Sequence, residues 1–386
     1  MGRGRRMTKA ARDSPPADRR PSLDSLTGLR FLAAMAVVIS HFTENGLVRV
    51  DSWVINALDG GRTAVSLFFV LSGFVLAYNY RDLAGRVPRW NFYVARFARI
   101  YPVVLLGLAL SALGVAYVCT RPNLLLAWFA LDSPNPGLLA SLGAQLTMTT
   151  GWLPFAALNQ PWNGPAWSIS CEVFFYALFP LLIIWFRRWS RPTVAVAALT
   201  VWLAQGVWIA VLTQYVPVNR GGFLIAQFPL THLAEFVLGI AAWRLWSGNP
   251  IDCRLRGIAL AGTVGALLTI ALYAPISPAY WPMTPLFALL VVLLAARGKA
   301  RSWLALPVML LLGEASYSLY LLHLPLVRVY EIAGVPPGPA GWAVMAATVL
   351  ISVIVFTWYE APLRRLIRRR LSRPAAVPTA VTAEPR

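Results

Sequence analysis

Apolar segments of nearly membrane-spanning length recur along the whole chain and limit what it can fold into. The hydrocarbon core of a bilayer is about 30 Å thick, so an α-helix needs roughly 20 mostly apolar residues to cross it. Lipid offers no partner to a free backbone N–H or C=O, so continuous apolar segments of this length are expected to be helices. We therefore predict an all-α, polytopic helical membrane protein with about ten transmembrane helices. The predicted spans lie at about residues 27–47, 63–80, 100–119, 167–186, 193–213, 223–243, 257–274, 283–296, 304–327 and 341–359.

The composition supports this prediction and excludes several other classes. Hydrophobic residues make up 58% of the chain and charged residues only 13%, unlike an ordinary soluble domain. The formal net charge of +19 does not indicate nucleic-acid binding, because the arginines are clustered between the apolar segments. The sequence has no P-loop, HExxH or GxSxG motif, which argues against ATP-driven pumps and the commoner hydrolases. The three cysteines have no paired spacing, so neither a disulfide framework nor a metal site is expected.

The positions of the basic residues predict the orientation. An even number of spans puts both termini on one side of the membrane, and positively charged loops favour the cytoplasm. If the N-terminus is cytoplasmic, only five of the 34 Lys and Arg residues fall in outer loops, namely Arg49, Arg62, Arg121, Arg220 and Arg328. Both termini are therefore predicted to be cytoplasmic.

Three regions of the chain follow from these patterns. Residues 1–22 are basic and rich in Pro and Ala, which predicts a disordered cytoplasmic tail rather than a cleaved signal peptide. The transmembrane domain is expected over residues 23–371, followed by a second disordered tail over 372–386. Residues 120–166 contain apolar runs that are too short to span, so we expect an outer loop with interfacial or re-entrant helices.

Arg30 and His41 place two ionisable side chains in the first predicted span. Eleven residues at about 100° each complete three turns with roughly 20° to spare, so both share one face, about 16 Å apart along the axis. Ionisable groups at membrane depth usually face a cavity or the interior of the bundle. An imidazole is also suited to accept a proton from an attacking hydroxyl. The alternatives are that Arg30 snorkels to the interface and that His41 makes a helix-packing hydrogen bond.

Polar residues near other spans add further candidates. Arg96 and Arg99, at i and i+3 on one helix face, could clamp a phosphate or merely anchor the helix at the inner surface. Ser168 and Glu172 share a face at the start of the fourth span, where Glu172 could orient a histidine or pair with an arginine.

A polar stripe runs along the ninth predicted span. Ser316, Tyr320 and His323 follow one another at i, i+4 and i+7 on an otherwise apolar helix. Packing hydrogen bonds explain many stripes of this kind. For His232 and Glu235 in the sixth span, a salt bridge or helix contact is the expected role.

These motifs, taken in order, resemble the bacterial membrane acyltransferase-3 family. RFLAAMAVVISH resembles its Arg-x10-His signature in the first helix, and RFARIYP resembles its Arg-x-x-Arg element. The resemblance covers about Asp24 to Arg370. The other matching stretches are VSLFFVLSGFVL, PAWSISCEVFFYALFP, SYSLYLLHLPL and YEAPLRR.

The resemblance implies an integral-membrane O-acyltransferase that transfers an acyl group, usually acetyl, from cytoplasmic acyl-CoA to a hydroxyl. It implies His41 as catalytic base or acyl carrier with Arg30 as its functional partner, Glu172 as a further catalytic residue, and Arg96 and Arg99 as the acyl-CoA site. Acyl-CoA is expected as a co-substrate, with no bound cofactor and no metal. One departure is His232, because members often carry an arginine near that position.

The resemblance also implies a tunnel across the bundle in which the thioester meets the acceptor. The acceptor would be a glycan, a glycolipid or a glycosylated small molecule such as a macrolide-type antibiotic. The expected location is the inner (plasma) membrane of a bacterium. Possible tunnel or acceptor residues are Trp167, Ser168, Ser316, Tyr320 and His323.

The main alternative is a secondary transporter or flippase with a buried His/Glu proton relay. Ten spans with buried ionisable groups would suit such a protein equally well. The sequence shows neither an inverted repeat nor a matched pair of broken helices, which weakens this alternative.

Overall fold

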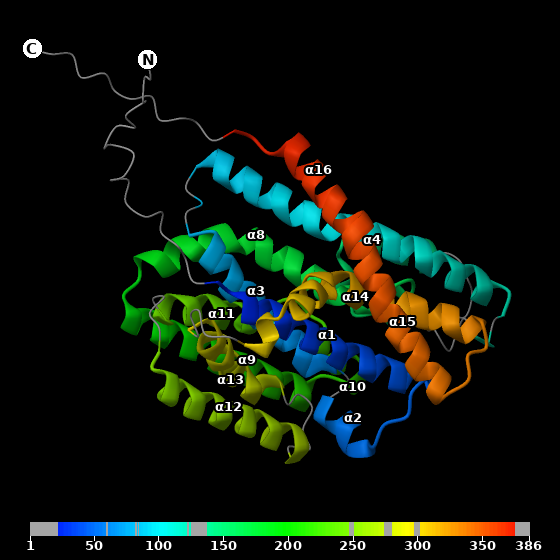
Figure 1. The fold of residues 1–386 in the computed structure, drawn as a ribbon, viewed down its shortest axis with the longest axis horizontal. Helices are drawn as coiled ribbons and strands as arrows, with labels where there is room; N and C mark the ends of the chain where they lie inside the picture. The colour runs from blue at the N-terminus through cyan, green and yellow to red at the C-terminus, as the bar shows by residue number, and fades with distance from the viewer. Residues whose placement is uncertain are drawn as a thin grey trace, which may run out of the picture.

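The fold was analysed in a computed structural model, and its regular elements are all helices in the residues that the structure describes. Figure 1 shows the long helices side by side in a bundle. The predicted all-α membrane fold is thus confirmed. The described residues are 22–58, 61–81, 83, 85–121, 123–124, 137–246, 251–273, 280–296 and 302–374.

Within the described residues, eight helical segments are long and apolar enough to cross a membrane. They correspond to eight of the ten predicted spans. They are α1 (Asp24–Glu44), α3 (Arg62–Asn79), α4 (Arg86–Cys119), α8 with its preceding turn (Gly164–Arg188), α9 (Arg191–Tyr215), α12 (Cys253–Tyr273), α14 (Pro307–Ile332) and α15 continuing into α16 (Pro339–Leu371).

The other two predicted spans are shorter than a membrane requires. The segment predicted at 223–243 is divided into α10 (Val218–Ala226) and α11 (Leu233–Trp246). Pro229 lies in the interruption, and proline has no N–H for a helical hydrogen bond. The segment predicted at 283–296 forms α13 (Tyr280–Ala295), which has only 16 residues.

Helix α11 is a core helix and not a lipid-facing one. Every residue from Ala234 to Ala242 is buried, as expected for a helix surrounded by other helices. Two glycines allow it to approach α3 closely. A Cβ on Gly73 would overlap the Phe236 carbonyl oxygen, and a Cβ on Gly239 would overlap that of Val70. By contrast, α12 lies at the edge of the bundle in Figure 1, and only 6% of the residues in its apolar 18-residue stretch are buried.

The outer segment before α8 contains short helices, in agreement with the predicted loop over 120–166. Asn163 secures this segment by donating from Nδ2 to the Leu321 carbonyl oxygen of α14 at 2.9 Å. That oxygen would normally accept from residue 325, which is a proline and has no N–H. The first apolar run of the loop lies mostly outside the described residues. The short helices of this segment are α6 (Gly137–Leu146), η3 (Thr150–Trp152), α7 (Ala156–Asn159) and η4 (Gly164–Ala166).

The remaining described elements are α2 (Ser52–Leu58), η5 (Trp303–Ala305) and a π-helical turn, η6 (Phe356–Glu360), that joins α15 (Pro339–Val355) to α16 (Ala361–Leu371). Figure 1 shows α16 crossing α4, and the two helices pack together. Most of the two predicted tails lies outside the described residues.

Candidate active site

Two cavities lie one after the other along the bundle. The first, of about 440 Å³, is here called the arginine cavity because Arg30, Arg96, Arg99, Arg364 and Arg368 line it. The second, of about 340 Å³, is here called the histidine cavity because His41 lines it. Arg30 and His41 of α1 thus reach different cavities, as their separation along one helix face predicts.

The arginine cavity collects most of the predicted site residues. Arg30 comes from α1, Arg96 and Arg99 from α4, and Glu172 from α8. The lining groups further include Ser168, Ser316 and Tyr320. Five arginines face two glutamates, Glu172 and Glu314, so the cavity carries an excess of positive charge.

Aromatic side chains hold the arginines of α4. Arg96 donates from Nη2 to the Tyr80 hydroxyl at 3.1 Å and lies 5.3 Å above the centre of that ring. Arg99 lies 5.9 Å above the centre of the Tyr317 ring. Glu172 accepts a hydrogen bond from the Tyr176 hydroxyl at 2.8 Å. Glu172 and Tyr176 both line the cavity that holds the arginines.

The histidine cavity is a polar chamber around His41. Its walls include Gln160 from the segment that leads into α8, Trp167 from the start of α8, Gln227 from the turn after α10, and Glu44 from the end of α1. The cavity is lined further by Asn45, Arg62 and Arg328. Arg328 donates to Asn45 Oδ1 at 2.9 Å and to Glu331 at 2.8 Å.

His41 contacts a second histidine across the interface between α1 and α14. His41 Nδ1 lies 2.9 Å from Nε2 of His323, and the ring centroids are 4.9 Å apart. His323 is completely buried and lines neither cavity, whereas His41 is half-buried. His323 was expected to line the tunnel. It lies instead behind His41, outside both cavities.

The hydrogen bonds of this pair define its tautomers when both rings are neutral. His323 Nδ1 lies 2.6 Å from the Tyr320 carbonyl oxygen, which can only accept, so this nitrogen carries the proton. The Nε2 atom of His323 must then accept from Nδ1 of His41. We accordingly assign a lone pair to Nε2 of His41, which makes this atom able to take up a proton or attack a carbonyl.

Tyr320 and Val65 line both cavities. The Tyr320 hydroxyl accepts from Ser168 Oγ at 2.8 Å and lies 3.2 Å from the Pro165 carbonyl oxygen, to which it donates. The two predicted tunnel residues Ser168 and Tyr320 thus meet where one cavity gives way to the other.

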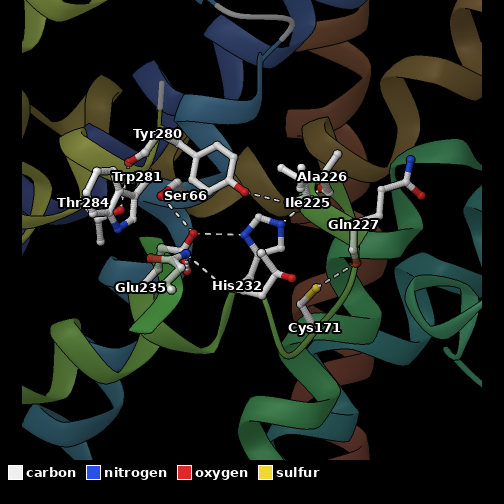
Figure 2. A network of polar contacts seen from close by, with 12 residues as sticks. Ser66, Cys171, Ile225, Ala226, Gln227, His232, Glu235, Tyr280, Trp281 and Thr284 are labelled. Carbon is white, nitrogen blue, oxygen red and sulfur yellow. Dashed lines mark hydrogen bonds and ion pairs between the residues drawn. The ribbon is translucent and has the colours of Figure 1, made fainter. Parts of the chain in front are cut away.

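His232 and Glu235 form the predicted structural pair (Figure 2), with His232 Nδ1 3.0 Å from Glu235 Oε1. The Nε2 atom of His232 lies 3.2 Å from the Ala226 carbonyl oxygen, and Gln205 donates to Glu235 at 3.0 Å. Both members of the pair are buried, and neither lines the arginine cavity or the histidine cavity. The pair supports the turn that carries Gln227, whose side chain points away from His232 in Figure 2.

Two arginines of the arginine cavity, Arg364 and Arg368, were not singled out as site residues from the sequence. Arg364 and Arg368 belong to the C-terminal basic cluster. A cytoplasmic C-terminus is enough to explain such a cluster, so its charge alone did not indicate a site. Their i, i+4 spacing on an amphipathic helix was the available signal. No group of three or more His, Cys, Asp or Glu side chains in the described part of the chain is arranged to hold a metal ion.

Comparisons with known proteins relate this arrangement to acyl transfer. The chain is 30% identical to acyltransferase MdmB of Streptomyces mycarofaciens, over 92% of this chain and 94% of that protein. It is 28% identical to exopolysaccharide production protein ExoZ of Rhizobium meliloti, over 80% of this chain and 92% of that protein. It is 24% identical to peptidoglycan O-acetyltransferase OatA of Listeria monocytogenes, over 90% of this chain but 56% of that longer protein.

No solved structure matches the chain significantly. A family model described as an acyltransferase domain matches residues 23–359, which covers most of the membrane-embedded chain and all of the cavity residues on α1 to α14. The chain therefore belongs to the acyltransferase-3 family of membrane proteins.

Proposed function

We propose that this protein transfers a short acyl group from cytoplasmic acyl-CoA to a hydroxyl of a sugar-containing acceptor. The observation that carries the proposal is the position of His41. His41 lines a polar cavity that adjoins, at Tyr320, a cavity lined by five arginines. A base and an anion-binding chamber are thus adjacent but distinct.

The arginine cavity suits the donor. Acyl-CoA carries several phosphate charges, and guanidinium groups bind phosphate through paired hydrogen bonds better than ammonium groups do. The guanidinium groups of Arg30, Arg96 and Arg99 come from two helices that face this one cavity. The uncharged pantetheine arm would extend from this cavity past Tyr320 toward His41.

The chemistry then requires one base and no bound cofactor. His41 Nε2 takes the proton of the acceptor hydroxyl while its oxygen attacks the thioester carbonyl. The new C–O bond forms, the C–S bond breaks, and the imidazolium returns the proton to the thiolate of CoA. Alternatively, the same lone pair accepts the acyl group first and passes it to the hydroxyl. The two routes differ in whether a radiolabelled acyl group stays on the protein when acceptor is omitted.

The histidine cavity suits a carbohydrate acceptor. Gln160, Gln227 and Glu44 offer hydrogen-bonding groups for hydroxyls, and Trp167 offers an aromatic face. ExoZ and OatA are named for exopolysaccharide and peptidoglycan, both carbohydrate polymers. The plasma membrane of a bacterium, with the arginine cavity toward the cytoplasm, is the location that fits this reaction.

The test is thiol release by purified protein in membranes supplied with acetyl-CoA and candidate sugar acceptors. Free CoA should appear at an appreciable rate only when an acceptor is present. His41→Gln and His41→Ala should lower kcat by roughly 10²- to 10⁴-fold, the usual contribution of a general base. Near-normal activity in either variant would contradict the role of His41. Comparing the metabolites of cells with and without the gene by mass would identify the acceptor.

A further inference from the structure

Helix α16 completes one wall of the arginine cavity. Arg364 and Arg368, one helical turn apart, both line it. Arg365 and Arg369 belong to the same helix, are exposed and are not among the residues that line the cavity. The helix thus has one basic face toward the cavity and another away from it.

The C-terminal end of α16 is fastened to the start of α4. Trp90 donates from its indole nitrogen to the Leu371 carbonyl oxygen at 2.7 Å. This bond satisfies one of the carbonyls that a helix end leaves without a partner. Asn91 donates to the Arg373 carbonyl oxygen at 2.9 Å and accepts from the Arg373 backbone N–H at 2.8 Å.

These contacts of Trp90 and Asn91 with residues 371–373 are here called the α16 latch. The guanidinium of Arg373 adds to the latch by lying 5.0 Å from the centre of the Trp90 ring. Arg373 is therefore held against α4, although the sequence places it in the predicted tail.

The arginines of α16 lie near the mouth of the cavity. Arg368 is exposed and Arg364 is half-buried, while Ser168 and Tyr320 at the other end are buried. Arg364 lies 3.8 Å from the carboxylate of Glu314, which is half-exposed. With Glu172 as the other glutamate in the lining, most of the positive charge of the five arginines remains uncompensated. A polyanion entering from the cytoplasm would meet these two arginines before it reached Arg30.

We propose that Arg364 and Arg368 bind phosphate groups at the nucleotide end of acyl-CoA, and that the α16 latch positions them. The inference rests on the proposed function, because it assumes acyl-CoA as the donor. The pantetheine arm is uncharged and has no use for these guanidinium groups. The nucleotide end carries the phosphates, and its charge keeps it outside the hydrocarbon core.

The same two arginines would also suit the phosphate of an anionic lipid headgroup, so the test separates the two sources. Full-length protein is reconstituted in nanodiscs of phosphatidylcholine, with or without phosphatidylglycerol. Equilibrium binding of CoA and of pantetheine is measured for the wild type, for Arg364→Gln/Arg368→Gln, and for the control Arg365→Gln/Arg369→Gln. The control removes the same charge from the same helix outside the cavity.

We expect the Arg364→Gln/Arg368→Gln protein to bind CoA at least tenfold more weakly, with its weaker pantetheine binding unchanged. The control should bind CoA like the wild type in either lipid. Equal CoA affinity in the cavity variant, or an equal loss in the control, would overturn the inference. CoA binding that Arg364→Gln/Arg368→Gln leaves unchanged in pure phosphatidylcholine, and changes only when phosphatidylglycerol is present, would assign these arginines to lipid instead.

The outcomes also separate this inference from the proposed function. A wild-type protein that binds no CoA contradicts acyl-CoA as donor altogether. A wild-type protein that binds CoA, with undiminished binding after Arg364→Gln/Arg368→Gln, contradicts only the role of α16.

Discussion

The contact between His41 and His323 determines which nitrogen of His41 is available for reaction. His323 keeps its Nδ1 proton on the Tyr320 carbonyl oxygen and accepts from His41 at 2.9 Å. His41 Nε2 is then free of a proton whenever both rings are neutral. His323 touches neither cavity, so we regard it as a positioning residue that acts through His41.

Substitution of His323 tests this role at the scale of a single side chain. His323→Phe fills the space but offers no acceptor to His41 Nδ1, and we expect kcat to fall by roughly 10- to 100-fold with little change in the KM for acyl-CoA. His323→Gln retains an acceptor oxygen and should recover part of the loss. Steady-state kinetics with both substrates varied provides the measurement. A change confined to the donor KM would contradict the assignment.

The helical period places Arg30 and His41 on one face of α1, and the structure has both lining cavities. The partner of His41 could not be predicted in this way. It lies on α14, 282 residues away, and only the packing of α1 against α14 brings the rings together. Glu172 left two alternatives open for the same reason, since local spacing does not say which helix it will face.

Among the helices, hydropathy predicts the long ones well and the core ones poorly. Hydropathy identifies the eight long segments because each of these helices is apolar both on the side that faces lipid and on the side that faces the core. The turn between α10 and α11 also carries apolar residues, so a hydropathy window runs across the break near Pro229. A buried helix such as α11 does not need to reach both membrane surfaces, because its neighbours cover it.

The α16 latch provides a prediction at the scale of this helix. Asn91→Ala removes two hydrogen bonds to Arg373 while leaving every cavity arginine in place. A hydrogen bond is worth about 0.5–1.5 kcal/mol, so two of them contribute about 1–3 kcal/mol, and CoA binding should weaken by at most roughly 5- to 150-fold. The same substitution added to Arg364→Gln/Arg368→Gln should weaken binding no further. Additive losses in the triple variant would separate the latch from the arginines.

The crossing of α3 and α11 should be sensitive to a single methyl group. Gly239→Ala would drive a Cβ into the Val70 carbonyl oxygen, and overpacking of this kind typically costs about 1–3 kcal/mol. We expect a lower thermal unfolding temperature in detergent, followed by intrinsic fluorescence. Gly262→Ala on α12 is the matched control, since an added Cβ there meets nothing within 4 Å. Equal melting of the two variants would refute the close approach.

For the whole molecule, the predicted orientation can be tested with the cysteines already present. Cys119 ends α4 and Cys253 begins α12, and both are exposed, whereas Cys171 is buried. With cytoplasmic termini, Cys119 lies outside and Cys253 inside. A membrane-impermeant maleimide should therefore label Cys119 in intact spheroplasts and Cys253 only after lysis, as read by mass spectrometry of peptides. The reverse pattern would invert the assigned topology.

Tyr320 separates the two chambers, and this has a consequence for the cell as well as for the reaction. Two aqueous chambers that met openly would form a pore through the plasma membrane and dissipate the proton gradient. Under the proposed function, the ring of Tyr320, whose hydroxyl accepts from Ser168 at 2.8 Å, is the group that would close that route between turnovers. Under the proposed function, the protein would carry an acyl group across a permeability barrier without opening it to ions, and one phenol side chain, that of Tyr320, lines both chambers.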